Sequence, residues 1–159
     1  MSHFEFLADG DADPRREFAK TLLVAIDSTS GPIIVYSPFE TSVLRDLAGH
    51  FPELSDRLLA VIDRICDLLP IVRAYVAHPD FLGSYSIKAV APALVQGFSY
   101  DDLERVVDGN DASAVFYQLV SDQSLPTEDR TWRRKALLAY CRHDTLAMLK
   151  VHRRLACSS

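Results

Sequence analysis

Apolar and polar residues recur with two different periods along the first third of this chain. HFEFLA (3–8) alternates around aromatic residues, as a strand does, while DPRREFAKTLLVAIDS (13–28) carries an apolar stripe at helical spacing behind Asp13 as N-cap. GPIIVYS (31–37) is a β-branched run short enough for a buried strand. A strand, a helix and a strand in about 35 residues predict a βαβ unit with parallel strands.

The pattern beyond residue 38 is mostly helical. FETSVLRDLAGH and PELSDRLLAVIDRICDLL each place apolar residues on one helical face, whereas PIVRAYVAHP resembles a short strand. In YSIKAVAPALV, Ser86 is a plausible cap and Pro92 is expected to kink or end the helix. The predicted elements of this part are helices at 39–50, 52–69, 85–95, 99–106, 111–122 and 128–156, a strand at 70–79, and a turn at 108–110.

Length and composition are those of one globular domain covering residues 1–159. The chain has 159 residues, of which 48% are hydrophobic and 25% charged. No apolar run approaches the roughly 20 residues that span a bilayer, and the acidic start MSHFEFLADGD is unlike a signal peptide. These features predict a cytoplasmic protein without a membrane partner.

Positive charge is clustered although the formal net charge is −5. RTWRRK (130–135) and KVHRRL (150–155) both lie on the last predicted helix. Such a run is usually a solvated helix face, so the charge balance alone argues neither for nor against nucleic acid. The three cysteines form no CxxC pair and have no zinc-ligand spacing, which suits reduced thiols.

Two carboxylates occupy positions that are unusual for a plain core. Glu40 follows directly after the predicted strand 31–37, where α/β sheets gather ligands. Asp144 lies four residues after Tyr140 and therefore on the same, otherwise apolar, face of the last helix. If Glu40 and Asp144 converge, their hard oxygen ligands suit Mg²⁺ or Mn²⁺.

Several stretches resemble a known family. FETSVLRDLA, DLLP, GSYSIKAVAPAL and LLAYCRHDTLAM are similar to the C-terminal part of bacterial domain-of-unknown-function family 2779, which is related to DnaQ-like 3′–5′ exonucleases of the tyrosine class. The resemblance runs from about Phe4 to Leu155. It implies an α/β, RNase H-like fold with a helix-rich C-terminal half, and RecB-like nuclease modules as partners.

The resemblance also implies roles for individual residues. Glu40, in Ser-Pro-Phe-Glu, takes the place of the third metal-binding carboxylate, and Asp144, in Tyr-x-x-x-Asp, takes the place of the fourth. Tyr140 would orient the attacking water while two metal ions assist phosphodiester hydrolysis. Lys88 and Ser86 would contact a nucleic-acid phosphate, and Trp132 would stack on a base.

Plainer interpretations stay open for each of these residues. Asp144 could cap a turn or pair with Arg133, Arg142 or Lys88, since structural ion pairs also place carboxylates in packed surroundings. Glu40 could be a helix N-terminal acid stabilised by the dipole. The remaining alternatives are a core tyrosine at 140, a solvated lysine at 88, and a Trp132 that anchors the long helix.

One departure from the family pattern is large. The family's first motif, Asp-x-Glu on a strand, has no counterpart before HFEFLA, so the chain is expected to be the C-terminal portion of a longer domain. We therefore expect the isolated chain to be inactive as a nuclease. The missing strand would also leave sheet edges unpaired, which predicts direct pairing of 3–8 with 31–37 or a homodimer through exposed strand edges. The alternative function is a non-catalytic helical module that scaffolds a nuclease complex.

Overall fold

The computed structural model describes residues 3–8, 12–101, 109–122 and 124–157. Its elements form two compact units. Unit 1 comprises Met1–Phe6 with Asp13–Ser86, and unit 2 comprises Leu7–Ala12 with Ile87–Ser159. The single domain expected over residues 1–159 and its RNase H-like architecture stay predictions.

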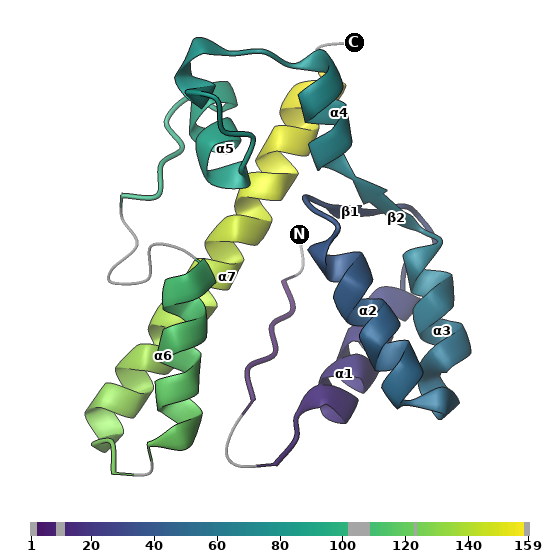
Figure 1. Cartoon of the computed structure of the whole chain (residues 1–159), viewed down its shortest axis with the longest axis vertical. Coiled ribbons are helices and arrows are strands. Elements are labelled where there is room, and N and C mark those ends of the chain that lie inside the picture. The colour runs from purple at the N-terminus through teal and green to yellow at the C-terminus, as the bar shows by residue number, and fades with distance from the viewer. Residues whose placement is uncertain (1–2, 9–11, 102–108, 123, 158–159) are drawn as a thin grey trace. The chain divides into compact units, whose positions relative to one another are not determined.

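Unit 1 packs its first three helices against one another, with a very small sheet at one end of the second and third (Figure 1). Just before the second helix, the Ser37 Oγ accepts a hydrogen bond from the Phe39 N–H at 3.2 Å, which makes a local turn at the helix start. Asp67 caps the fourth helix through the Leu69 N–H at 2.9 Å. The elements in chain order are α1 Arg15–Asp27, β1 Ile33–Val35, α2 Phe39–His50, α3 Pro52–Ile62, β2 Ile65–Asp67, α4 Leu68–Tyr75 and the 3₁₀ turn η1 Pro79–Phe81.

The sheet differs from the predicted βαβ unit. β1 pairs in parallel with β2, in the register Ile33 with Ile65 and Val35 with Asp67, and the crossover between them consists of α2 and α3. Residues 3–8 belong to neither a helix nor a strand, so the strand predicted there, and its direct pairing with 31–37, are wrong. Of the two phenylalanines in this segment, Phe6 packs with its ring 5.7 Å from that of Phe18, whereas Phe4 is 70% exposed.

The pattern predicted the helix that begins at residue 52 but assigned the wrong elements to much of residues 63–79. The helix predicted over 52–69 ends at Ile62 and is followed by β2, and the strand predicted at 70–79 is occupied largely by α4. Ile62 and Ile65 are three residues apart, as on a helix, although α3 ends at Ile62 and β2 begins at Ile65. The sequence pattern therefore gives no sign of the strand. In α4, β-branched residues suggested a strand, but Asp67 as cap fixes a helical start.

The core of unit 1 is one apolar cluster between its first three helices. Leu58 has no exposed surface and lies on α3, while Leu23 on α1 and Leu47 on α2 are almost as deeply buried. The buried members of the cluster are Ala19, Leu23, Leu44, Leu47, Ala48, Leu54, Leu58 and Val61. This cluster orients the start of α2, and with it Glu40.

Unit 2 is built on one long helix. α5 Ile87–Leu94 and α6 Gly109–Ser121 both pack against α7 Thr127–Ala156, α6 along its first half and α5 along its second (Figure 1). Pro92 lies inside α5, which ends two residues later. Most of the helix predicted at 99–106 and part of the turn at 108–110 lie outside the described residues.

The buried face of α7 follows a regular three-four spacing. Leu137, Tyr140, Ala147 and Val151 are buried, and Asp144 falls at the position between Tyr140 and Ala147 in that stripe. A half-buried carboxylate therefore interrupts an apolar stripe in the middle of the helix.

Candidate functional site

Glu40 stands in the first turn of α2, immediately after the loop that leaves β1. Its Oε2 accepts a hydrogen bond from the Ser37 hydroxyl at 3.1 Å, and the same hydroxyl oxygen accepts from the Phe39 N–H. The side chain is partly exposed. This arrangement agrees with the helix-start role and leaves the second carboxylate oxygen available in principle for a ligand.

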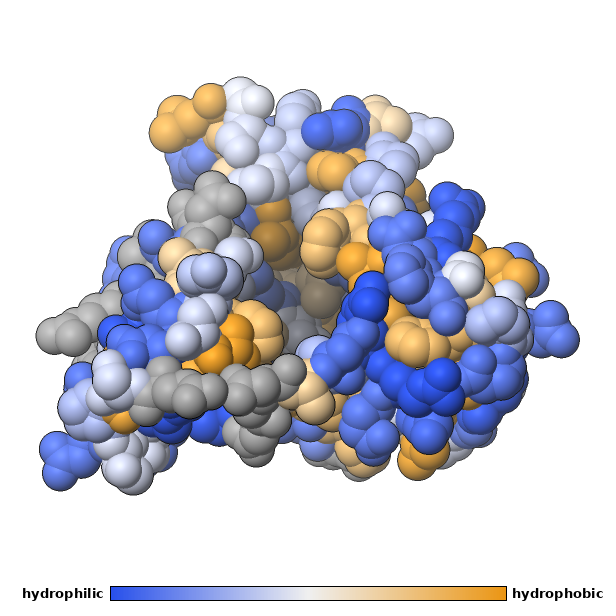
Figure 2. All heavy atoms as spheres, turned by 60° about the horizontal axis from the view of Figure 1, so that its bottom comes forward, coloured by the Kyte–Doolittle hydropathy of each residue, from blue (hydrophilic) through white to orange (hydrophobic). Residues whose placement is uncertain are grey.

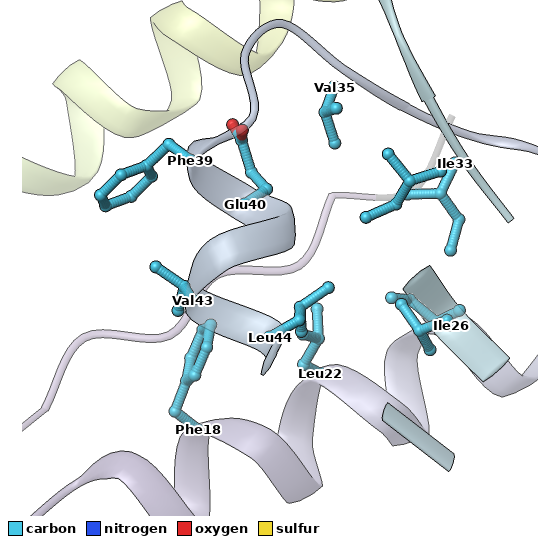
Figure 3. Close-up of a pocket in the computed structure, with 11 residues that line it drawn as sticks. Phe18, Leu22, Ile26, Ile33, Val35, Phe39, Glu40, Val43 and Leu44 are labelled. Carbon is cyan, nitrogen blue, oxygen red and sulfur yellow. The ribbon is translucent and has the colours of Figure 1, made fainter. Parts of the chain in front are cut away.

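Below Glu40 lies an apolar pocket of about 230 Å³. Figure 3 shows the Glu40 oxygens turned toward the loop before α2 and away from Phe18 and Leu22. Phe39 is 70% exposed beside it. The lining residues are Phe18, Leu22, Ile26, Ile33, Val35, Phe39, Glu40, Val43, Leu44, Val61 and Ile65.

Asp144 is surrounded by different chemistry in unit 2. Its Oδ1 is buried and has no hydrogen-bond partner of ordinary geometry among the described residues, so none of Arg133, Arg142 and Lys88 donates to that oxygen. A buried acceptor of this kind is costly, and more so when it carries charge. The position favours a compensating cation, which is the property expected of a metal ligand.

Two tyrosines lie beside Asp144. Tyr140 is buried one turn earlier on α7, and the hydroxyl of Tyr100 is buried without a hydrogen bond of ordinary geometry. Burial raises the pKa of Tyr100 well above its ordinary value, and the negative charge of Asp144 raises that pKa further. The phenol thus stays protonated near neutral pH and remains a donor close to the carboxylate.

Lys88 brings a positive charge to the same cluster. Its Nζ lies 4.7 Å from the ring centroid of Tyr140 and 5.6 Å from that of Tyr100. These are cation–π distances, so the lysine of α5 is held against the two rings rather than extended into solvent. The alternative of a solvated lysine is wrong in that respect.

His143 has a structural role next to this cluster. Its ring stacks on Phe98 at 4.6 Å, and its Nε2–H donates to the Ser99 carbonyl at 2.7 Å. The imidazole therefore ties the segment after α5 to α7. Phe98 and Tyr100 were not predicted as site residues, because no sequence spacing links them to a helix some 40 residues later.

The remaining predicted residues are Ser86 in unit 1 and Trp132 in unit 2. Ser86 is exposed at the end of unit 1, where its N–H donates to the Ser84 hydroxyl at 3.3 Å. Trp132 is half-buried near the start of α7, in a shallow hollow with Glu128 and Lys135. Nothing in these contacts distinguishes stacking on a base from anchoring of the helix, so both interpretations of Trp132 stand.

The arginines beside Trp132 serve the fold. Arg130 donates to the carbonyls of Leu119 and Asp122 at 2.9 and 2.8 Å, and Arg134 donates to those of Ala8 and Leu7 at 3.0 and 3.3 Å. These bonds join α7 to α6 and to the segment 7–8. The basic run 130–135 is therefore largely occupied by contacts within unit 2.

A complete metal centre is not assembled by the part of the chain that the structure describes, since no group of three or more His, Cys, Asp or Glu side chains there could hold an ion. Asp144, with its orphaned Oδ1, fits one ligand of Mg²⁺ or Mn²⁺. Glu40 belongs to unit 1 and Asp144 to unit 2. Their convergence at one pocket stays a prediction.

Comparison with known proteins establishes the family. Residues 1–86 match the family described as Domain of unknown function (DUF2779). This is more than half of the chain, which therefore belongs to that family. The matched range covers unit 1, whereas the resemblance noted for GSYSIKAVAPAL extends beyond it and LLAYCRHDTLAM lies wholly outside it.

Searches of curated proteins and of solved structures found no match. Among the described residues, no helix combines the length and the apolar character that crossing a membrane requires.

Proposed function

We propose that this chain is part of a metal-dependent nucleic-acid phosphodiesterase domain, similar to 3′–5′ exonucleases, that acts in the cytoplasm. The observation that carries the proposal is the buried, unpartnered Oδ1 of Asp144 within a cluster of tyrosines and one lysine. A purely structural carboxylate in that stripe would be expected to have a donor.

The chemistry assigns each residue a task. Asp144 would hold an Mg²⁺ or Mn²⁺ ion, which when bound activates water and stabilises the leaving oxygen. Tyr140, one turn before Asp144, would orient the attacking water through its hydroxyl. Lys88, already placed over the Tyr140 ring, would contact a phosphate, and Glu40 would supply a second carboxylate if unit 1 brings it to the same site.

We expect no cleavage by the chain alone, because two adjacent metal ions need more carboxylates than Glu40 and Asp144 provide. The missing ligands would come from an Asp-x-Glu segment or from a partner, for which a RecB-like nuclease module is the first candidate. Processive degradation of single-stranded DNA by the isolated chain in the presence of Mn²⁺ would contradict this expectation.

Thermal denaturation with and without metal tests the assignment of Asp144. Mg²⁺ or Mn²⁺ should raise the melting temperature of the wild type, because a ligand that binds only the folded state stabilises it. Asp144→Asn should abolish that shift, because a neutral amide is a much poorer ligand for Mg²⁺ or Mn²⁺ than a carboxylate. Asp129→Asn, at an exposed position in the first turn of α7, is the matched control and should keep the metal shift.

The alternative is a non-catalytic interaction module, and one feature of unit 1 favours it. The Ile33 N–H donates to the Arg64 carbonyl on the β2 side, so the N–H and C=O of Ile34 face the opposite edge of β1. Ile33 and Val35 of β1 line the apolar pocket, as does the exposed Phe39 (Figure 3). A homodimer through β1, with Ile34 on the two-fold axis, would pair the edge and cover the pocket.

Sedimentation equilibrium decides this alternative. A dimer that Phe39→Ser weakens would support the interaction role, because the substitution removes an apolar side chain at the mouth of the pocket. No metal shift together with a dimer would favour the module over the nuclease. A monomer at all concentrations would reject the homodimer.

A further inference from the structure

A second hollow lies at the far end of unit 2, outside the cluster around Asp144. α5, the two residues that follow it and the end of α7 form an open surface depression of about 430 Å³ there. Its walls combine apolar and cationic side chains. They are Leu94, Val95, Gln96, Lys150, Arg153, Arg154 and Cys157.

The charged side chains that line this hollow are all positive. Lys150, Arg153 and Arg154 line it, no acidic residue does, and the sequence contains no Asp or Glu after Asp144. The C-terminal dipole of α7 opposes an anion with about half an elementary charge, which three full positive charges outweigh. In a chain with a net charge of −5, this is a local reversal of sign.

Packing fixes part of this charge in place. Gly97 has a φ of 72°, a left-handed conformation that glycine adopts without strain, and the chain then returns Phe98 to α7. The Lys150 Nζ lies 5.1 Å from the Phe98 ring centroid, and that ring stacks on His143. The ammonium group is thus held at the side of the hollow by an aromatic pair.

The other basic run of α7 provides the contrast. The guanidinium groups of Arg130 and Arg134 donate hydrogen bonds to backbone carbonyls of unit 2. Arg153, by contrast, is exposed in the last turn of the helix and lines the hollow. The two basic runs therefore differ, since Arg130 and Arg134 hold the fold while Arg153 lines the hollow at an exposed position.

We infer that this hollow binds the phosphate groups of a nucleic-acid strand. Lys150, Arg153 and Arg154 would neutralise successive phosphates, the Gln96 amide would donate to a phosphate oxygen, and Leu94 with Val95 would contact the apolar faces of the sugars. The inference rests on the proposed function, because it gives the nuclease domain a site that holds the strand away from Asp144. A pocket that mixes cations with apolar floor residues suits a sugar–phosphate chain better than an isolated ion.

Fluorescence anisotropy with labelled single-stranded DNA in EDTA tests the inference without requiring cleavage. Arg153→Gln/Arg154→Gln should weaken binding at least about tenfold at 50 mM salt, and adding Lys150→Gln should weaken it further. Three neutralised phosphates contribute about −2 to the slope of log K against log salt for a single strand, so the triple variant should flatten the slope by about that amount.

The control removes the same amount of charge elsewhere in the chain. Lys20→Gln/Arg45→Gln removes two exposed cations of unit 1 and should change binding by less than about twofold. Arg153→Lys/Arg154→Lys keeps the charge and should retain most of the affinity, which excludes misfolding as the cause of a loss. Equal weakening by the two Gln pairs, or no weakening by either, would overturn the inference.

Two further experiments distinguish a nucleic-acid strand from the other ligands that carry phosphate, namely free phosphate and a lipid surface. Inorganic phosphate at low millimolar concentration should not displace the DNA, and vesicles containing phosphatidylserine should not bind more weakly to the Arg153/Arg154 variant than to wild type. Displacement, or a loss of vesicle binding, would assign the hollow to a free anion or to a lipid surface instead. Asp144→Asn should bind DNA like wild type, so a failure of the metal assignment and a failure of this site give different results.

Discussion

Unit 1 and unit 2 divide the properties of this chain unequally. Unit 1 carries the family match, a continuous apolar core and a wholly apolar pocket wall around one carboxylate, Glu40. Unit 2 carries the clustered tyrosines, Lys88, the orphaned Asp144 oxygen and the basic hollow. The family match therefore covers mainly the residues that build the apolar core of unit 1, whereas most of the candidate site residues lie in unit 2, outside the matched range.

The largest expected effect concerns the independence of the two units. Leu58→Ala removes a side chain with no exposed surface from unit 1 and should cost about 3 kcal/mol. Trp132 is the single tryptophan and lies in unit 2, so its emission reports that unit. In urea, Leu58→Ala should move the transition seen by far-UV circular dichroism and leave the Trp132 transition in place.

Val151→Ala is the reciprocal control, because Val151 is fully buried in unit 2 and should move the Trp132 transition. A shift of the Trp132 transition by Leu58→Ala would show instead that the units unfold together. The division into two units would then be geometric and not thermodynamic.

An intermediate effect separates the two basic runs. Arg130→Gln loses hydrogen bonds to two carbonyls that connect α6 with α7, which should cost about 1–2 kcal/mol in urea unfolding followed by Trp132 emission. Arg153→Gln, at an exposed position, should change stability by less than about 0.5 kcal/mol. Equal costs would mean that the second run also serves the fold.

The smallest effect compares one buried tyrosine from each unit. The Tyr36 hydroxyl of unit 1 donates to the Tyr85 carbonyl at 3.0 Å, whereas the Tyr100 hydroxyl of unit 2 lies near the Asp144 carboxylate without ordinary hydrogen-bond geometry. At pH 7, Tyr36→Phe should therefore cost about 1 kcal/mol and Tyr100→Phe close to nothing. Urea titrations of the two variants measure the difference.

The same tyrosines predict a loss of stability in alkali. Burial raises the pKa of Tyr36 to about 12, and the pKa of Tyr100 is raised as well. The unfolded chain releases these protons from about pH 10, so the stabilisation is complete below that pH and declines as the pH rises through the folded values. Each Phe variant should show a shallower decline above pH 10, and an unchanged profile would contradict the burial of that phenol.

The hydrophobic pattern predicted the helices better than the strands, because each helix buries one apolar stripe and exposes polar side chains on its other faces. Figure 2 shows the apolar side chains of one face as separate patches within a hydrophilic surface, which is the result of helices with one buried stripe each. The bounds of α2 are those that the pattern predicted, and α7 begins one residue earlier than expected. Both helices have long periodic stripes and clear polar flanks.

The strands were harder because each depends on a partner that the local sequence does not reveal. β2 is three residues long and sits inside an apolar run that continues the spacing of α3, whereas HFEFLA has the alternation of a strand but no paired neighbour. Pairing is a tertiary property. Asp67 before two leucines and a proline was the one local signal that α4 begins there.

The candidate site was predictable in part. Tyr140 and Asp144 were found because they share a helical face, which needs only the period of 3.6 residues. Tyr100 and Phe98 were not found, since their position depends on how the chain turns after α5. The cation–π contacts of Lys88 with Tyr100 and Tyr140 likewise come from packing and have no sequence signature.

The length of α7 sets a fixed separation inside unit 2. The helix has 30 residues, so Trp132 and Arg153 stand about 30 Å apart along a continuous axis. An oligonucleotide of two or three residues seated among Lys150, Arg153 and Arg154 would leave the indole emission unchanged. A longer strand that lies along the helix axis would reach Trp132 and quench its emission. The shortest oligonucleotide that causes quenching would therefore show whether the bound strand runs along α7.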